Sequence, residues 1–169
     1  MAIDKIQSES INLGDNFAFT GTVSGAGGNN QPYFTAYSTS NISLSQNTAT
    51  IIVLSNTLVN QGSAYNTSDG KFKPQVAGNY FVFFNFYLKT LNKSVLQEAY
   101  ILKNGSSTSI QSANEAAAST AKRQPTNLSG IVTMNGSSDY LQASITQYDY
   151  TSGEAKSIDD TQFGSFKII

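Results

Sequence analysis

Four aspartates near the C-terminal end of the chain are the first residues that could do chemistry. Asp159 and Asp160 are adjacent, and Asp139 and Asp149 precede them. Hard cations such as Ca²⁺ bind clusters of carboxylate and carbonyl oxygens. The spacing of these four residues matches no calcium-binding loop motif, and aspartates are mostly exposed to solvent. Calcium binding near Asp159 and Asp160 therefore stays open, beside the simpler interpretation that they are solvated loop carboxylates.

Glu98 is a second candidate for chemistry, because it lies in a strand-like run just before Tyr100. Glycoside hydrolysis needs two carboxylates flanking the scissile bond, and the sequence names no partner for Glu98. The chain contains no His and no Cys, which excludes Ser-His and Cys-His nucleophile pairs, thiol redox chemistry and the usual zinc sites. We assign no catalytic residue, no metal ligand and no cofactor, and predict that the protein is not an enzyme.

A group of tyrosines could instead recognise a partner. Tyr148, Asp149 and Tyr150 follow one another, and Tyr140 lies a short distance before them. Aromatic rings beside a carboxylate are common where proteins contact carbohydrate or other proteins. Tyr148 and Tyr150 are therefore candidates for an outward binding loop, and packing at the edge of a core is the competing interpretation.

The charge balance limits the partners further. The chain has 10 Lys and Arg against 11 Asp and Glu, a net charge of −1. Phosphate binding needs concentrated positive charge, so we expect no nucleic acid partner. No apolar run reaches the roughly 18 residues that span a bilayer, so we expect no membrane insertion.

Short runs rich in aromatic and β-branched residues indicate an all-β protein. They are separated by tight-turn signals such as Ser68-Asp69-Gly70, Lys103-Asn104-Gly105-Ser106, Asn135-Gly136-Ser137 and Ser152-Gly153. The one exception is the Ala-rich stretch 112–122, which lacks a broad apolar stripe and is interpreted as a loop with at most a short helical turn. We predict a β-sandwich or jelly roll with strands at residues 33–38, 49–54, 78–88, 98–102, 128–134, 140–148 and 163–169.

The run from Tyr80 to Leu88 is apolar on both faces except at Asn85. An antiparallel strand with one wet face should alternate apolar and polar residues. One face must therefore meet the sandwich core, and the other must be covered by a neighbouring subunit or by a loop of the same chain. We assign Tyr80, Val82, Phe84 and Phe86 to the core strand or to a trimer interface.

The residues in and around this run resemble the signature of the globular head of complement component 1q, a fold shared with the tumour necrosis factor superfamily. The signature positions are Leu54, Asn60, Tyr65, Phe72, Gly78, Tyr80, Val82 and Phe84, and the chain departs from the family's residue types at Leu54 and Val82. The turn after Leu102 and the closing stretch Phe163-Gly164-Ser165-Phe166 are also similar to the family's. The resemblance covers about residues 32–169, and it implies a ten-stranded jelly-roll β-sandwich that assembles into a homotrimer.

The first 31 residues differ from the rest. Isolated apolar positions run into a Gly-rich linker at residues 25–30, and we divide the chain into an extended N-terminal anchoring segment, 1–31, and a jelly-roll head domain, 32–169. Residues 9–13 and 17–27 resemble leader segments of structural proteins of tailed phages. The interpretation as an extra edge strand of the head stays open. The candidate anchoring residues are Ile3, Ile6, Ile11, Leu13, Phe17, Phe19 and Val23.

These observations predict a non-enzymatic virion structural protein. In the first hypothesis it is a homotrimeric capsid decoration or cement protein, attached to the major capsid protein or another virion protein through its N-terminal segment. In the second it is a head or tail fibre tip that binds a host surface glycan or protein through loops near residues 106–123 or 148–156. We expect synthesis in the host cytoplasm and a final location on the capsid exterior.

Overall fold

The computed structural model describes residues 30–90, 95–116, 122–149 and 156–168. Within these ranges every named element is a strand, and no helix is long and apolar enough to cross a membrane. The strands are β1 (Tyr33–Ser38), β2 (Ile42–Leu44), β3 (Ala49–Ile52), β4 (Asn56–Gln61), β5 (Tyr65–Asn66), β6 (Lys71–Phe72), β7 (Ala77–Thr90), β8 (Val95–Lys103), β9 (Ser106–Ala116), β10 (Lys122–Asn135), β11 (Leu141–Asp149) and β12 (Lys156–Lys167).

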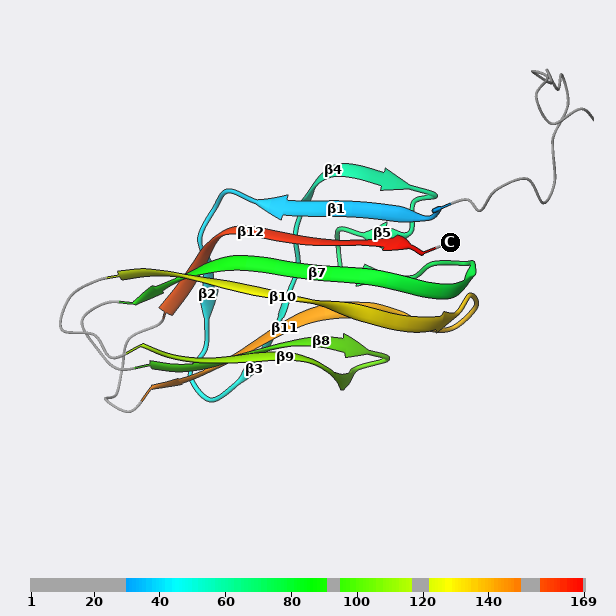
Figure 1. Cartoon of the computed structure of the whole chain (residues 1–169). Coiled ribbons are helices and arrows are strands. Elements are labelled where there is room, and N and C mark those ends of the chain that lie inside the picture. The colour runs from blue at the N-terminus through cyan, green and yellow to red at the C-terminus, as the bar shows by residue number, and fades with distance from the viewer. Residues whose placement is uncertain (1–29, 91–94, 117–121, 150–155, 169) are drawn as a thin grey trace, which may run out of the picture.

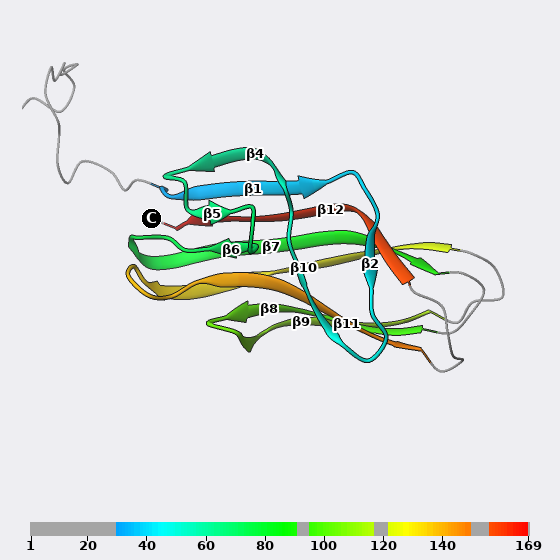
Figure 2. The ribbon, with the colours of Figure 1, turned by 180° about the vertical axis from the view of Figure 1, so that it is seen from behind.

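The strands form two antiparallel sheets that pack face to face (Figures 1 and 2). Sheet A has the order β10-β7-β12-β1-β4, with β2 pairing on β12. Sheet B has the order β5-β6-β11-β8-β9, with β3 pairing on β11. Sequence neighbours such as β7 and β8 lie in different sheets, as in a jelly roll. The predicted all-β jelly-roll sandwich is confirmed.

The predicted strands fall on β1, β3, β7, β8, β10, β11 and β12, but β10 begins at Lys122 instead of residue 128 and β12 begins at Lys156 instead of residue 163. The prediction of a loop over 112–122 is wrong for its first part, because residues 112–116 belong to β9. Alanine has a low strand propensity. Here backbone pairing with β8 holds these residues in a strand, and one face of that strand turns toward the interior. Ile110, Ser112 and Asn114 are half-buried, whereas the residues between them are exposed.

Every second side chain of β7 points into the core between the sheets. Tyr80, Val82, Phe84, Phe86 and Leu88 are each at most 2% exposed, and the residues between them point to the other side of sheet A. An aromatic cluster fills one end of this core. In it Phe34 stacks on Tyr65 and on Phe72 at centroid distances of 4.6 Å and meets Phe163 edge-on at 5.0 Å.

Different strand ends lie at the two ends of the sandwich, which we call near and far by their position relative to Asn30, the first described residue. The near end holds the start of β1 and the end of β12, where the backbone N–H of Lys167 donates to the carbonyl of Asn30 at 3.3 Å. The far end holds the other termini of the long strands, since Thr90 pairs with Lys122 and Val95 pairs with both Ala116 and Asp149. The ends of β7, β9 and β11 and the starts of β8, β10 and β12 therefore lie at the far end, opposite to the C-terminus (Figure 1).

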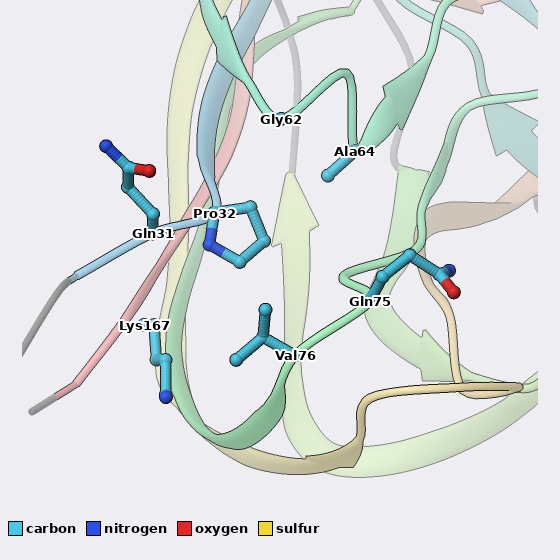
Figure 3. Close-up of a pocket in the computed structure, with 7 residues that line it drawn as sticks. All are labelled: Gln31, Pro32, Gly62, Ala64, Gln75, Val76 and Lys167. Atoms are coloured by element: carbon cyan, nitrogen blue, oxygen red, sulfur yellow. The ribbon is translucent and has the colours of Figure 1, made fainter. Parts of the chain in front are cut away.

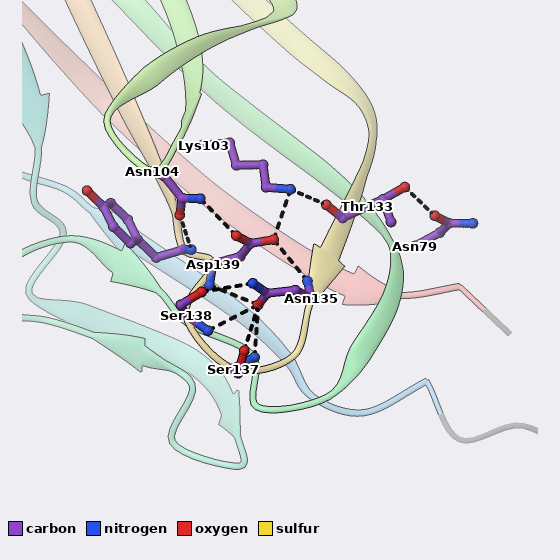
Figure 4. Close-up of polar contacts among 9 residues, drawn as sticks. Asn79, Lys103, Asn104, Thr133, Asn135, Ser137, Ser138 and Asp139 are labelled. Carbon is purple, nitrogen blue, oxygen red and sulfur yellow. Dashed lines mark hydrogen bonds and ion pairs between the residues drawn. The ribbon is translucent and has the colours of Figure 1, made fainter.

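Two turns at the near end are locked to each other (Figure 4). Asn104 and Gly105 both have positive φ, 54° and 81°, as the predicted two-residue turn between β8 and β9 requires. The Asn104 amide donates to Asp139 at 2.8 Å, and its oxygen accepts the backbone N–H of Tyr140 at 2.9 Å. Lys103 forms an ion pair with Asp139 at 2.9 Å and donates to the Thr133 carbonyl at 2.7 Å. These contacts tie sheet B to β10 of sheet A.

Candidate functional site

The outer surface of sheet A carries aromatic side chains that the head domain itself does not bury. We call it the aromatic face and define it by Tyr33, Phe81, Phe83, Tyr87 and Phe166. Tyr33 is 37% exposed, Phe166 40% and Tyr87 36%, while Phe81 and Phe83 are half-buried. Large exposed apolar groups that lie together mark interaction surfaces on soluble proteins. This face is the candidate functional site.

Strand register brings these residues into rows. Phe166 of β12 pairs with Tyr33 of β1 and with Phe81 of β7, so all three lie side by side on the same face. The rings of Phe81 and Phe166 are 5.4 Å apart. Phe81 also pairs with Ile131 of β10, which is 63% exposed. One apolar row thus crosses four neighbouring strands.

The next row contains a position, Gly164, at which a side chain would collide with its neighbours. Gly164 lies between Thr35 and Phe83 in the register, and the Phe83 ring lies over its backbone. A Cβ on Gly164 would meet that ring at 2.3 Å and the Phe34 carbonyl at 2.9 Å. The space between Phe83 on one side and Tyr33 and Phe166 on the other is a groove of about 330 Å³. The rings of Tyr33, Phe83 and Phe166 line this groove.

A charged cluster borders the aromatic face toward the far end. The Arg123 guanidinium lies 4.3 Å from the Tyr87 ring centroid, in cation–π geometry, and donates to Asp159 at 3.1 Å and to Asp160. Lys89 forms an ion pair with Asp159 at 3.0 Å. Burial of Asp159 opposes its ionisation, but the hydrogen bonds from Lys89 and Arg123 outweigh this and lower the pKa of the carboxyl.

This cluster bears on the calcium question. Both carboxylates engage cationic side chains, and Asp139 lies at the opposite end of the sandwich in the turn network. The side chain of Asp149 lies outside the described residues. Within the described ranges, no three His, Cys, Asp or Glu residues are grouped as metal ligands.

Glu98 lies on the outer surface of sheet B and is hydrogen-bonded to neighbouring tyrosines. Its Oε2 accepts hydrogen bonds from the hydroxyls of Tyr100 at 2.7 Å and Tyr148 at 3.2 Å. The hydrogen bond to Glu98, with smaller contributions from burial and charge, raises the pKa of Tyr100 to about 12. Tyr148 therefore lies on a strand beside Glu98, half-buried, and not in a loop. Tyr150 lies outside the described residues.

The sequence assigned Tyr80, Val82, Phe84 and Phe86 to the core strand or a trimer interface, and the structure buries all four between the sheets. The outward residues Phe81, Phe83 and Tyr87 were not named, although the same run and its period of two contain them. Tyr33 and Phe166 were not named either, and only the sheet register could bring them next to Phe81. The anchoring candidates from Ile3 to Val23 lie outside the described residues.

The near end offers a second hollow, a cleft of about 350 Å³ (Figure 3). Pro32, Ala64 and Val76 give it an apolar floor, and Lys167 lies at its edge. Val76 is 42% exposed. Because Asn30 is hydrogen-bonded to Lys167, this cleft lies where the described chain begins.

Comparison with known proteins identifies the family. The C1q domain matches residues 33–154, which is most of the chain. The chain belongs to the C1q domain family. Comparison with curated protein sequences gives no match.

Solved structures share this fold at low sequence identity. The globular domain of zebrafish complement 1qA protein is 15% identical, with a TM-score of 0.53, over 82% of this chain and 98% of that chain. Crystal structures of murine APRIL at pH 5.0 and pH 8.0 are each 11% identical, with TM-scores of 0.57 and 0.56, over 80% of this chain and 98% of that chain. The C1q and tumour necrosis factor-like fold predicted from the sequence is therefore confirmed.

Proposed function

We propose that this C1q-domain protein is a non-enzymatic virion structural protein whose head domains associate as a homotrimer through the aromatic face. The observation that carries the trimer is the apolar row of Tyr33, Phe166, Phe81 and Ile131 across four strands. Fully burying a side chain such as Phe is worth about 1.5–3 kcal/mol. A closed ring of three copies would cover this row on every subunit at once.

The groove between Phe83 and the pair Tyr33 and Phe166 supports the same proposal. It is about 330 Å³ in volume and is bounded by aromatic rings. Interfaces draw most of their affinity from a few aromatic anchors in such pockets. The polar rim expected around an interface is supplied by the exposed side chains of Arg123 and Asp160. The aromatic face therefore combines the central and peripheral chemistry of an association surface.

Attachment to a capsid is proposed for the N-terminal segment, with Ile3, Ile6, Ile11, Leu13, Phe17, Phe19 and Val23 as the anchoring residues. The described chain starts at the near end, beside the cleft of Pro32, Val76 and Lys167. A head anchored there would face the shell with its near end and the solvent with its far end. Three linked segments would multiply weak contacts through effective concentration. The protein would act as a capsid decoration or cement protein on the virion exterior.

The test uses the full chain and purified shells of the capsid protein of the phage that carries this gene. Light scattering is expected to give three times the single-chain mass of 18.1 kDa. The trimer is expected to co-sediment with the shells, and the double variant Phe17→Asp/Phe19→Asp is expected to stay trimeric and remain in the supernatant. A monomeric wild-type chain would overturn the trimer, and equal sedimentation of the variant would overturn the anchor.

One observation favours a second candidate function, a fibre tip that binds a host surface glycan or protein. The outer surface of sheet B carries a fixed aromatic and acidic group formed by Tyr100, Glu98 and Tyr148. Tyr148 lies one residue before the far end of β11. Aromatic rings with a carboxylate suit carbohydrate contacts. Trimers that ignore the shells but bind host cells, and lose that binding in Tyr148→Ala, would favour this function over capsid decoration.

A further inference from the structure

Two glutamines are buried inside the far end of the sandwich with no polar partner. Gln97 of β8 is 1% exposed and Gln147 of β11 is 0% exposed. Within the part of the chain that the structure describes, neither the Oε1 nor the Nε2 of either residue has a hydrogen-bond partner. Buried amides in folded proteins nearly always have partners, because desolvating them without hydrogen bonds is costly. These four atoms therefore point to a ligand.

The register places the two side chains together. Gln97 and Gln147 are directly paired across β8 and β11, and both alternate with residues on the outer surface of sheet B. They therefore lie side by side and face the interior. Since all four amide atoms are without partners, the two amides do not bond to each other, although their strands are paired.

Residues of β9 in sheet B and of β10 in sheet A extend the same polar region. On β9, Asn114 is paired with Gln97, and its amide donates to the Thr126 hydroxyl of β10 at 2.8 Å. Gln124 lies two residues from Thr126 on the same face of β10, and its Oε1 is also buried without a partner. Leu88, the register partner of Gln124, is fully buried and apolar, so it offers no hydrogen bond. Both sheets therefore place buried polar side chains at the far end of the interior, beside apolar ones such as Leu88.

The mixture of orphaned atoms restricts the chemistry of the ligand. An amide oxygen accepts hydrogen bonds and an amide nitrogen donates them. A cation would satisfy only the oxygens, and an anion would satisfy only the nitrogens. Water does both, and an internal water typically makes about three hydrogen bonds to such groups. We infer that Gln97 and Gln147 hold internal water between the sheets, with the Oε1 of Gln124 as a further acceptor.

A crystal structure of the full chain, at a resolution that shows ordered solvent, tests the inference directly. We expect a water peak within about 2.7–3.2 Å of an amide atom of both Gln97 and Gln147. Two amides bonded directly to each other, with no water between them, would overturn the inference. So would both amides turned outward to bulk solvent.

Thermal unfolding provides the second measurement. Gln147→Leu leaves the Gln97 amide and its water short of partners, so we expect its Tm to fall by roughly 5 °C. The double variant Gln97→Leu/Gln147→Leu removes both polar groups and the water, and it should regain most of that loss. Gln111→Leu, at an exposed position on β9, is the matched control and should change little. Losses that add in the double variant would contradict a shared ligand.

Discussion

The outer surfaces of the two sheets use aromatic residues in opposite ways. On sheet B the hydroxyls of Tyr100 and Tyr148 both donate to Glu98, so their polar atoms are satisfied within the subunit. On sheet A the rings of Tyr33, Phe81 and Phe166 form a row in which Tyr33 stays 37% exposed and Phe166 40% exposed. The same fold thus presents one surface suited to water and one suited to another protein surface. Side-chain content alone does not distinguish them, because the difference lies in what each ring touches.

The strongest test of this contrast places the same charge on each face. Phe166 is 40% exposed on sheet A and Ile51 is 37% exposed on sheet B. We expect Phe166→Asp to reduce the particle from a trimer to single chains of 18.1 kDa, because it buries a charge in the proposed interface. Ile51→Asp should remain a trimer. Light scattering distinguishes the two, and a similar mass for both variants would remove the distinction between the faces.

A second test concerns the backbone under Phe83. Gly164→Ala puts a methyl group against the Phe83 ring and the Phe34 carbonyl, whereas Gly130→Ala meets only the side chain of Ile110. We expect Gly164→Ala to lower the free energy of unfolding by about 1–3 kcal/mol, as overpacking does, and Gly130→Ala to cost less because a side chain moves more easily than backbone. Urea denaturation measures both. A larger cost at Gly130 would show that the Gly164 contact does not constrain sheet A.

A third test addresses sheet B through its tyrosines. The hydrogen bond to Glu98 raises the pKa of Tyr100 to about 12 from its ordinary value of 10.0. Because the folded-state pKa is raised, this contact stabilises the fold below about pH 10, and the stabilisation is lost as the pH rises toward 12. Glu98→Gln should bring the pKa back toward 10.0. Subtracting the tyrosinate absorbance titration of Tyr100→Phe isolates this group, and an unchanged pKa would mean that the contact is not formed.

The smallest effect is expected at acid pH, where the near-end turns and the rim of the aromatic face each depend on a carboxylate. Hydrogen bonds from Asn104 and Lys103 lower the pKa of Asp139 to about 2 from 3.8. A lowered pKa gives stability that is present above about pH 4 and is lost as the pH falls toward 2. Asp139→Asn should flatten this part of the stability curve. Asp159→Asn removes the ion-pair partner of Lys89 and Arg123 and should also flatten the curve, because the pKa of Asp159 is lowered as well. Urea unfolding across this pH range measures both variants.

Much of the fold was predictable from the sequence. The alternation in β7, the Asn104-Gly105 turn and the closing strand around Phe163 each carry a local signal that the structure keeps. Strand β9 lacked such a signal, because its Ala and Ser residues form a strand only through pairing with β8. Local composition cannot reveal a conformation that a neighbouring strand imposes.

The site was predictable only in part. The run from Tyr80 to Leu88 indicated a strand that needs cover on two sides, and the outward residues of that run form the centre of the aromatic face. Tyr33 and Phe166 join this face because strand pairing places them beside Phe81. Strand pairing cannot be read from a single sequence. Gln97 and Gln147 looked like ordinary strand residues, since burial of a glutamine has no signature in spacing or composition.

The hydrogen bond between Lys167 and Asn30 has a consequence for engineering. Because the two ends of the head domain lie next to each other, a short linker could join them, and new termini could be opened elsewhere without separating paired strands. The far-end strand termini, such as Thr90 of β7 and Lys122 of β10, are the places next to which to open it or to insert a foreign peptide. A peptide inserted there would project away from whatever holds the chain at Asn30, which makes this head a scaffold for display.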